Sequence, residues 1–143
     1  MTAKVFLDTN ILLYAVSAKP EESPKREVAK SLLERDDIGL SVQVLQEFYV
    51  NATQKIATPI PHDLAIKFIV GFTRYPVASI TIGLMAEALE IKTRYQISYW
   101  DAAIIAAAQE LRCTTLCTEG LNPGQQFGNL QVLNPFAPKV KLP

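Results

Sequence analysis

Short apolar runs alternate along the chain with longer segments in which apolar residues recur at helical spacing. The short runs have the length of buried strands and lie at 5–7, 38–41, 77–81, 115–117 and 130–133. The longer segments predict helices over 11–16, 24–35, 44–55, 63–73, 84–95 and 99–112. Strands that alternate with helices indicate an α/β domain whose mainly parallel sheet is covered on both faces.

The chain is organised as one unit. Its 143 residues are enough to bury a sizeable core, and they contain no internal repeat, low-complexity tract or long linker. We therefore expect a single domain over residues 1–136, followed by a C-terminal tail over 137–143.

Composition narrows the range of functions. Lys plus Arg and Asp plus Glu both number 14, so the formal net charge is zero. This balance argues against a protein that coats nucleic acid or a membrane surface, but it leaves room for a nuclease. The beginning of the chain lacks the pattern of a signal peptide, and no segment is suited to span a membrane. Two cysteines make no disulfide framework, so we expect a cytoplasmic protein that does not enter a membrane.

The inventory of histidine and cysteine excludes several kinds of site. A Cys/His zinc site normally takes four ligands, and His62, Cys113 and Cys117 offer only three candidates. A Ser-His-Asp or Cys-His mechanism would depend on His62 alone. Any catalytic chemistry is therefore expected to use carboxylates.

Two acidic residues directly follow predicted strands. Asp8 comes after the run at 5–7, and Glu119 comes after the run at 115–117. In parallel sheets, ligands bind beyond the carboxyl ends of the strands, which is where both carboxylates would lie. Taken alone, Asp8 could equally serve as a helix cap and Glu119 as a turn residue.

Two further acidic residues lie on predicted helices. Glu47 has apolar neighbours, although it also falls on a polar helical stripe with Gln43 and Asn51, which fits a solvated face. Asp101 stands third after Ser98 in a capping-box pattern. The helix beyond Asp101 is apolar on every face, which indicates a buried helix and a charge that needs a partner. Clustered carboxylates without histidine suit Mg²⁺ or Mn²⁺, and a cation of this kind supports phosphodiester hydrolysis.

Several motifs resemble those of PIN-domain ribonucleases. Phe6–Leu12 (FLDTNIL) is similar to the opening motif of that family, Gln46–Phe48 to its second acidic position, and Ser98–Ala103 (SYWDAA) to its third. The resemblance extends to Leu116–Glu119 and Asn134–Phe136 and so covers nearly the whole chain. Size and motif order resemble the VapC-type toxins of toxin–antitoxin pairs.

The resemblance implies a three-layer α/β/α sandwich of PIN type and a Mg²⁺- or Mn²⁺-dependent endoribonuclease that acts on RNA. It also implies a homodimer and a small antitoxin that occludes the site. The implied metal ligands are Asp8, Glu47 and Asp101. Thr9, Asn10 and Thr118 would support them through hydrogen bonds.

The chain departs from the family pattern at one position. Many relatives read Ser/Thr-Glu-Asp-Leu where this chain has Thr118-Glu119-Gly120-Leu121, and the aspartate is usually the fourth acid. Glu119 is the remaining candidate for a fourth catalytic carboxylate, one residue earlier.

Two other functions compete with the ribonuclease. A phosphatase could use Asp8 as its nucleophile. Such enzymes resemble one another in an Asp-x-Asp motif at this point, and this chain has Asn10 where the second aspartate belongs. A degenerate PIN-fold binding or regulatory module would keep the fold and the partner with weak or no turnover, and Gly120 favours it. A dinucleotide-binding module is disfavoured, because no glycine-rich turn follows the first strand.

Overall fold

A six-stranded sheet forms the centre of the computed structural model, which describes residues 2–138 and 140–143. Along the chain its strands are β1 (Val5–Leu7), β2 (Ile38–Ser41), β3 (Val77–Ala78), β4 (Thr115–Cys117), β5 (Gln126–Phe127) and β6 (Leu130–Leu133). Their order across the sheet is β3-β2-β1-β4-β6-β5, and all pairs are parallel except β5 with β6. The predicted mainly parallel sheet is confirmed.

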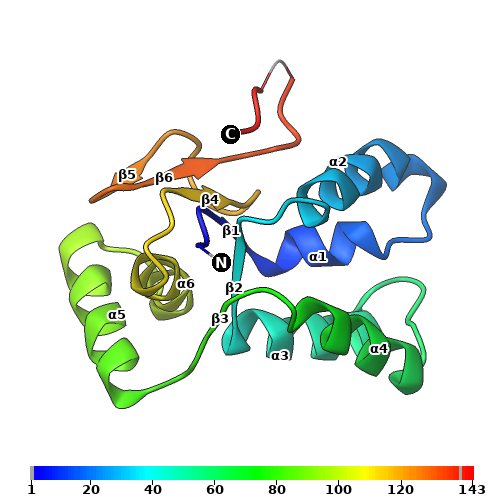
Figure 1. Cartoon of the computed structure of the whole chain (residues 1–143), viewed down its shortest axis with the longest axis horizontal. Helices are drawn as coiled ribbons and strands as arrows, with labels where there is room; N and C mark the ends of the chain where they lie inside the picture. Colours follow the sequence, from blue (N-terminus) through cyan, green and yellow to red (C-terminus); the bar gives the residue numbers. More distant parts are fainter. Residues whose placement is uncertain (1, 139) are drawn as a thin grey trace.

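Helices cover both faces of the sheet (Figure 1). Helices α5 (Ile82–Tyr95) and α6 (Tyr99–Glu110) lie on one side. The other side carries α1 (Thr9–Ala15), α2 (Ser23–Leu33), α3 (Val42–Val50) and α4 (His62–Phe72). Two short elements, the 3-10 turn η1 (Pro20–Glu22) and the π-helical turn η2 (Asn51–Lys55), follow α1 and α3. These three layers confirm the expected α/β/α sandwich.

The middle of helix α6 is buried on every side, as its composition predicts. Residues 102–108 are all buried, and the helix contacts α5, β2, β3 and β6. Small residues allow this close approach. At Gly39 in β2, an added Cβ would lie only 2.9 Å from Cδ1 of Leu111, just after α6. The C-terminal end of α6 therefore lies close against β2.

Side-chain caps determine where three helices begin after extended segments. The hydroxyl of Ser41 accepts a hydrogen bond from the backbone N–H of Val44, and that of Thr81 accepts one from Leu84. Ser98 accepts one from the N–H of Asp101, so the predicted cap at this helix is present. Two of these caps fix α3 and α6, the helices that carry Glu47 and Asp101.

Three local features differ from the prediction. Strand β3 is only two residues long, and the helix predicted to continue to Lys55 changes to a π-turn after Val50. In that segment Asn51 donates to the carbonyl of Glu47, and such side-chain bonds compete with regular helical bonding. Strand β5 was not predicted, because a two-residue strand gives too short an apolar pattern.

Both cysteine thiols are free and buried. Burial raises the pKa of each thiol to about 12, so neither is a reactive thiolate at neutral pH. Within the described residues, no helix combines the length and apolar character that a membrane crossing requires.

Candidate active site

The carboxylate of Asp8 lies where β1 ends and α1 begins. Its backbone N–H donates to the carbonyl of Cys117 at 3.0 Å, which aligns the ends of β1 and β4. Its Oδ1 accepts a hydrogen bond of 2.7 Å from the N–H of Thr9, and Oδ2 accepts one of 2.8 Å from the hydroxyl of Thr118. Asp8 is therefore a helix cap and is also fixed at the carboxyl end of the central strands β1 and β4.

Glu47 reaches the same place from the middle of α3. Its Oε1 accepts a 2.6 Å hydrogen bond from the hydroxyl of Thr9, and its Oε2 accepts one of 3.3 Å from Nε2 of Gln43. Thr9 thus contacts both carboxylates, through its N–H to Asp8 and its hydroxyl to Glu47. Thr9 is only 7% exposed, so the bridge is largely shielded from water.

Asp101 contributes a third carboxylate from the first turn of α6. Its negative charge and that of Glu47 act on Asp8. Burial is the main cause that raises the pKa of Asp8. The hydrogen bonds from Thr118 and Thr9 act to lower this pKa, and the charges of Glu47 and Asp101 raise it further. The charges of Glu47 and Asp101 therefore both reach Asp8.

Asn10 and Thr118 organise the loop after β4. Nδ2 of Asn10 donates to the hydroxyl oxygen of Thr118 at 3.3 Å, and Oδ1 of Asn10 accepts from the N–H of Glu119 at 3.4 Å. The same hydroxyl oxygen accepts from the N–H of Gly120 at 3.0 Å. These contacts fit the supporting role expected for both side chains.

The structure does not bring Glu119 to the other three carboxylates. Its Oε1 accepts from the Tyr14 hydroxyl at 2.7 Å, and its Oε2 pairs with Nζ of Lys25 at 2.5 Å. Burial acts to raise the pKa of Glu119, but hydrogen bonds from Lys25 and Tyr14 outweigh it and lower the pKa below 4.5. Lys25 also lies 4.7 Å from the centroid of the Tyr14 ring. The contact of Tyr14 with Glu119 could not be predicted from the sequence, because Tyr14 lies in an apolar helical run with no signal that links it to Glu119.

The donor set of the three carboxylates fits a hard divalent cation. All donors are oxygen atoms. Burial, and to a smaller extent the charges of Glu47 and Asp101, disfavour the ionised form of Asp8, and a bound cation would favour it. In the described part of the chain, no three His, Cys, Asp or Glu side chains are already close enough together to hold an ion. Mg²⁺ commonly binds through one or two carboxylates and keeps several waters, so it does not need a preformed cage of three.

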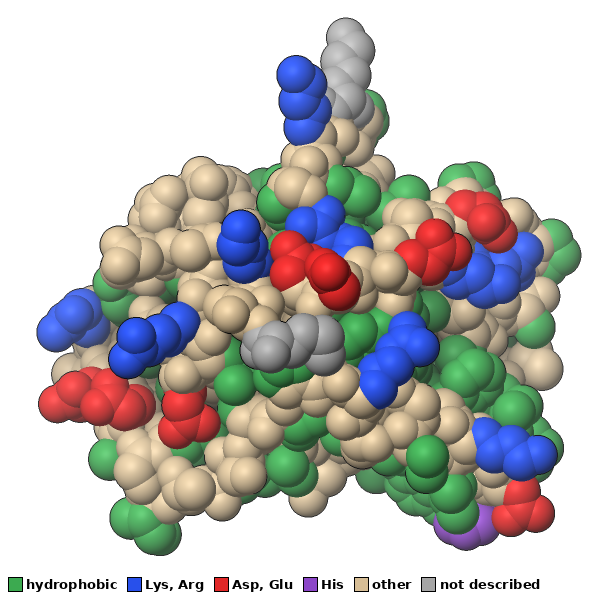
Figure 2. Space-filling view, viewed as in Figure 1, with side chains coloured by type: hydrophobic (Ala, Val, Ile, Leu, Met, Phe, Trp, Pro, Cys, Tyr) green, Lys and Arg blue, Asp and Glu red, His purple; other side chains and the backbone are tan. Residues whose placement is uncertain are grey.

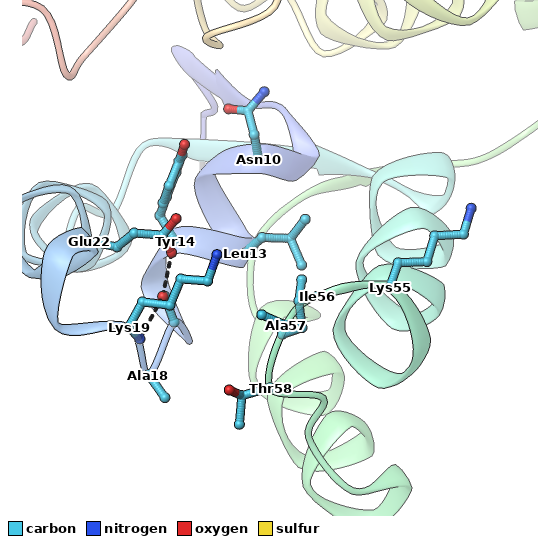
Figure 3. A pocket seen from close by; sticks show the side chains of 11 residues that line it. Asn10, Leu13, Tyr14, Ala18, Lys19, Glu22, Lys55, Ile56, Ala57 and Thr58 are labelled. Carbon is cyan, nitrogen blue, oxygen red and sulfur yellow. Dashed lines mark hydrogen bonds between the residues drawn. The ribbon is translucent and has the colours of Figure 1, made fainter.

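Two cavities adjoin the site, and Lys55 lines both. One, of about 380 Å³, is lined by Glu47, Trp100 and polar side chains of α3 and η2. The other, of about 310 Å³, runs from Asn10 along α1 to the segment after η2 (Figure 3). Acidic and basic side chains are interspersed over the face in Figure 2. This face therefore presents no charged surface of a single sign.

Comparison with known proteins gives one family match and several structural ones. The family model described as PIN domain matches residues 5–122. No match to a curated protein sequence reaches significance.

Solved structures of low sequence identity share the fold. A toxin–antitoxin complex from Klebsiella pneumoniae has a TM-score of 0.69 and 20% identity, covering 92% of this chain and 98% of that one. VapC20 of Mycobacterium tuberculosis, a Sarcin-Ricin loop cleaving toxin, has a TM-score of 0.62 and 19% identity, covering 79% and 87%. FitAcB from Neisseria gonorrhoeae has a TM-score of 0.62 and 18% identity, covering 92% and 98%.

Proposed function

Because the chain belongs to the PIN-domain family, we propose that it is a Mg²⁺- or Mn²⁺-dependent endoribonuclease and the toxin of a toxin–antitoxin pair. One observation carries the proposal. Asp8 lies just beyond the carboxyl end of β1, and the charges of Glu47 on α3 and Asp101 on α6 both act on it. A group of acids held this way is costly without a cation and suited to hold one.

Asp8, Glu47 and Asp101 would hold the cation. When bound, it supplies a Lewis acid for the phosphodiester and lowers the pKa of a water molecule. Thr9 and Thr118 orient Asp8 through the hydrogen bonds described above, and each leaves the carboxylate ionisable. Partners of this kind typically change metal affinity or activity by about 10- to 100-fold when they are lost.

A protein partner is proposed for the cavity in Figure 3. The similar structure from Klebsiella pneumoniae is a toxin–antitoxin complex, and the shared fold favours a partner of the same kind here. The cavity combines apolar side chains such as Leu13 and Ile56 with the charged Lys19 and Glu22, and it begins at Asn10. An antitoxin segment seated there would cover the approach to Asp8.

A homodimer is proposed from the outer face of α5. Ile82, Met85 and Leu89 are exposed by 85%, 47% and 46%, and they follow one another at helical spacing. A run of apolar side chains along one helix face marks a protein interface more often than a solvated surface. A second copy of the chain would cover it.

The nuclease proposal is tested with purified protein freed of any antitoxin. Structured and unstructured RNA are incubated with it in Mg²⁺, in Mn²⁺ and with chelator, and the Asp8→Asn protein controls for a contaminating nuclease. We expect cleavage that requires both the cation and Asp8. Cleavage that survives in the Asp8→Asn protein would show that the assigned site is wrong.

The degenerate binding module is the second candidate, and one observation favours it. The fourth acidic position of the family is Gly120 here, and the neighbouring Glu119 is bound to Lys25. A folded protein that binds Mn²⁺ and an antitoxin but cleaves neither RNA would support this second function.

A further inference from the structure

The only tryptophan of the chain lies exposed beside the candidate site. Trp100 directly precedes Asp101 in the first turn of α6, and 65% of its surface is exposed. Tryptophan is highly buried on average in folded proteins. An indole left open next to a candidate catalytic residue is therefore a surface on which a ligand can pack.

The indole ring is held in a defined orientation. It meets the ring of Tyr99 edge-on, with 5.1 Å between the ring centroids and 76° between the ring planes. Tyr99 is half-buried and packs against the hydrophobic core. The contact with Tyr99 restricts the indole on one side, which reduces the side-chain freedom lost when a ligand stacks on it.

Trp100 lines the cavity of about 380 Å³ that also contains Glu47. Nε2 of Gln43 donates to the carbonyl of Trp100 and to Oε2 of Glu47, both at 3.3 Å. One amide side chain thus links the backbone of Trp100 to a candidate catalytic carboxylate. The remaining polar lining consists of the amides of Gln46 and Asn51 and the ammonium of Lys55.

This combination of groups matches one chemical class of ligand. Unpaired nucleobases stack on aromatic rings and form hydrogen bonds with amide side chains, and a lysine can contact the adjoining phosphate. We propose that Trp100 stacks an unpaired base of the RNA beside the carboxylates, which makes this cavity a base-binding subsite. The inference rests on the proposed ribonuclease function. It predicts a preference for single-stranded over double-stranded RNA, because paired bases are already stacked.

A second copy of the chain is a less suitable occupant. The cavity combines amide and charged side chains with the exposed Trp100 and Val50, whereas α5 presents an uninterrupted row of exposed apolar residues at Ile82, Met85 and Leu89. Homodimer contacts favour the more apolar surface.

Fluorescence measures the proposed contact directly, because Trp100 is the sole source of tryptophan emission. The Asp8→Asn protein, which keeps the RNA intact, is titrated with a single-stranded oligonucleotide and with a duplex of the same strand. The titration is done without added cation. We expect the single strand to quench the emission and the duplex to leave it nearly unchanged. Equal quenching by both would overturn the stacking proposal.

Substitutions give a second measurement. The Trp100→Leu change is expected to weaken binding of the single strand by roughly 5- to 150-fold, while Trp100→Tyr retains most of the affinity, because stacking contributes about 1–3 kcal/mol per base. In cleavage assays we expect Trp100→Leu to raise KM more than it lowers kcat. Val70→Ser on α4, also at a site with 65% exposure, is the matched control and should bind RNA like the parent.

The outcomes separate this inference from the proposed function. If the parent protein cleaves RNA and Trp100→Leu binds and cleaves it equally well, the subsite is refuted while the nuclease stands. If single-stranded RNA quenches the emission but no cation supports cleavage, the nuclease is refuted and the stacking site stands. If RNA leaves the emission unchanged and dilution of the protein shifts it, a second copy covers Trp100 and the subsite is refuted.

Discussion

The hydroxyl of Thr118 donates a 2.8 Å hydrogen bond to Oδ2 of Asp8, although the two residues are 110 positions apart in the chain. The bond joins the ends of two neighbouring strands and orients the carboxylate that the nuclease proposal depends on most. Thr118 is fully buried, so this donor is shielded from water. A buried hydrogen bond to a charged group contributes more than one at the surface.

Replacing Thr118 with valine keeps the shape and removes the hydroxyl. Asp8 then loses a donor, and the Asn10 amide and the Gly120 N–H lose their acceptor. We expect the free energy of unfolding to fall by about 1–3 kcal/mol, and RNA cleavage to fall by about 10- to 100-fold. Thr118→Ser, which keeps the hydroxyl, should stay close to the parent in chemical denaturation and in cleavage assays. A loss in Thr118→Ser as large as that in Thr118→Val would show that the hydroxyl does not account for the effect.

The raised pKa of Asp8 predicts how pH changes the effect of a cation on stability. Asp8 stays protonated up to a higher pH in the folded state than in the unfolded state, where its pKa is near 3.8. The contribution of Asp8 to stability therefore falls as pH rises from that value through the folded pKa. Cation binding favours the ionised form, so Mn²⁺ should raise the melting temperature more at about pH 7 than at about pH 4.

Calorimetry with and without Mn²⁺ tests this dependence. The Asp8→Asn protein is the control, and it should lose most of the Mn²⁺-induced rise at both pH values. A rise that is the same at low and neutral pH in the parent protein would contradict the assignment of Asp8 as a ligand.

Replacing Glu119 with glutamine tests whether this residue holds the cation. Its carboxylate already pairs with Lys25, so we expect Mn²⁺ affinity by calorimetric titration to stay within a few-fold of the parent, while Asp8→Asn abolishes it. The pair is partly exposed, so the cost in stability should be about 0–1 kcal/mol. Because the pKa of Glu119 is lowered in the folded state, its contribution to stability is fully present above pH 4.5. This contribution is lost as the pH falls through the lowered pKa. Loss of Mn²⁺ binding in Glu119→Gln would establish it as a ligand.

The position of Gly120 has room for the aspartate found in many relatives. A Cβ there would have the Thr118 hydroxyl oxygen at 3.6 Å as its nearest neighbour, which is an ordinary contact. We expect Gly120→Asp to fold, to bind Mn²⁺ more tightly by several-fold and to be slightly less stable without the cation, because it adds a like charge. Gly120→Asn, which adds a similar volume without charge, should leave Mn²⁺ affinity unchanged. A drop in affinity for Gly120→Asp would show that a fourth carboxylate does not fit this site.

Gly39 and Gly71 offer a matched test of packing. Alanine at 39 would place its Cβ 2.9 Å from Leu111 and 3.1 Å from the Cβ of Ala3, so we expect a loss of about 1–3 kcal/mol from overpacking. Gly71 lies in α4 with nothing within 4 Å, and alanine there should add about 0.5–1 kcal/mol. Denaturant unfolding of both variants measures the difference. Equal stability of the two would contradict the close contact of β2 with the chain after α6.

Much of the fold could be predicted because its signals are local. The apolar runs at β1, β2 and β4 are buried strands, and Ser98 caps α6 as its spacing indicates. The gathering of Asp8 and Asp101 follows from the parallel arrangement, which the alternation of strands and helices predicts. The short β5 could not be predicted, since pairing with β6 rather than its own composition makes it a strand.

The partner of Glu119 could not be predicted from the sequence for a different reason. Lys25 lies 94 positions away on α2, and its ammonium reaches Glu119 only because α2 packs against α1 beside Tyr14. No periodic pattern of apolar residues in the sequence indicates that packing. The position after β4 indicates where the backbone of Glu119 lies, but the side chain turns toward the nearest positive charge.

The place of β1 between β2 and β4 also governs when the site can exist during synthesis. Asp8 leaves the ribosome early, but Thr118, which orients its carboxylate, is translated 110 residues later. A growing chain can form its first helices before it contains β4, the strand whose end places Thr118 beside Asp8. Assembly of the three carboxylates is therefore deferred until almost the entire polypeptide has been released. The proposed nuclease would therefore be withheld from the messenger RNA that encodes it until translation is nearly complete.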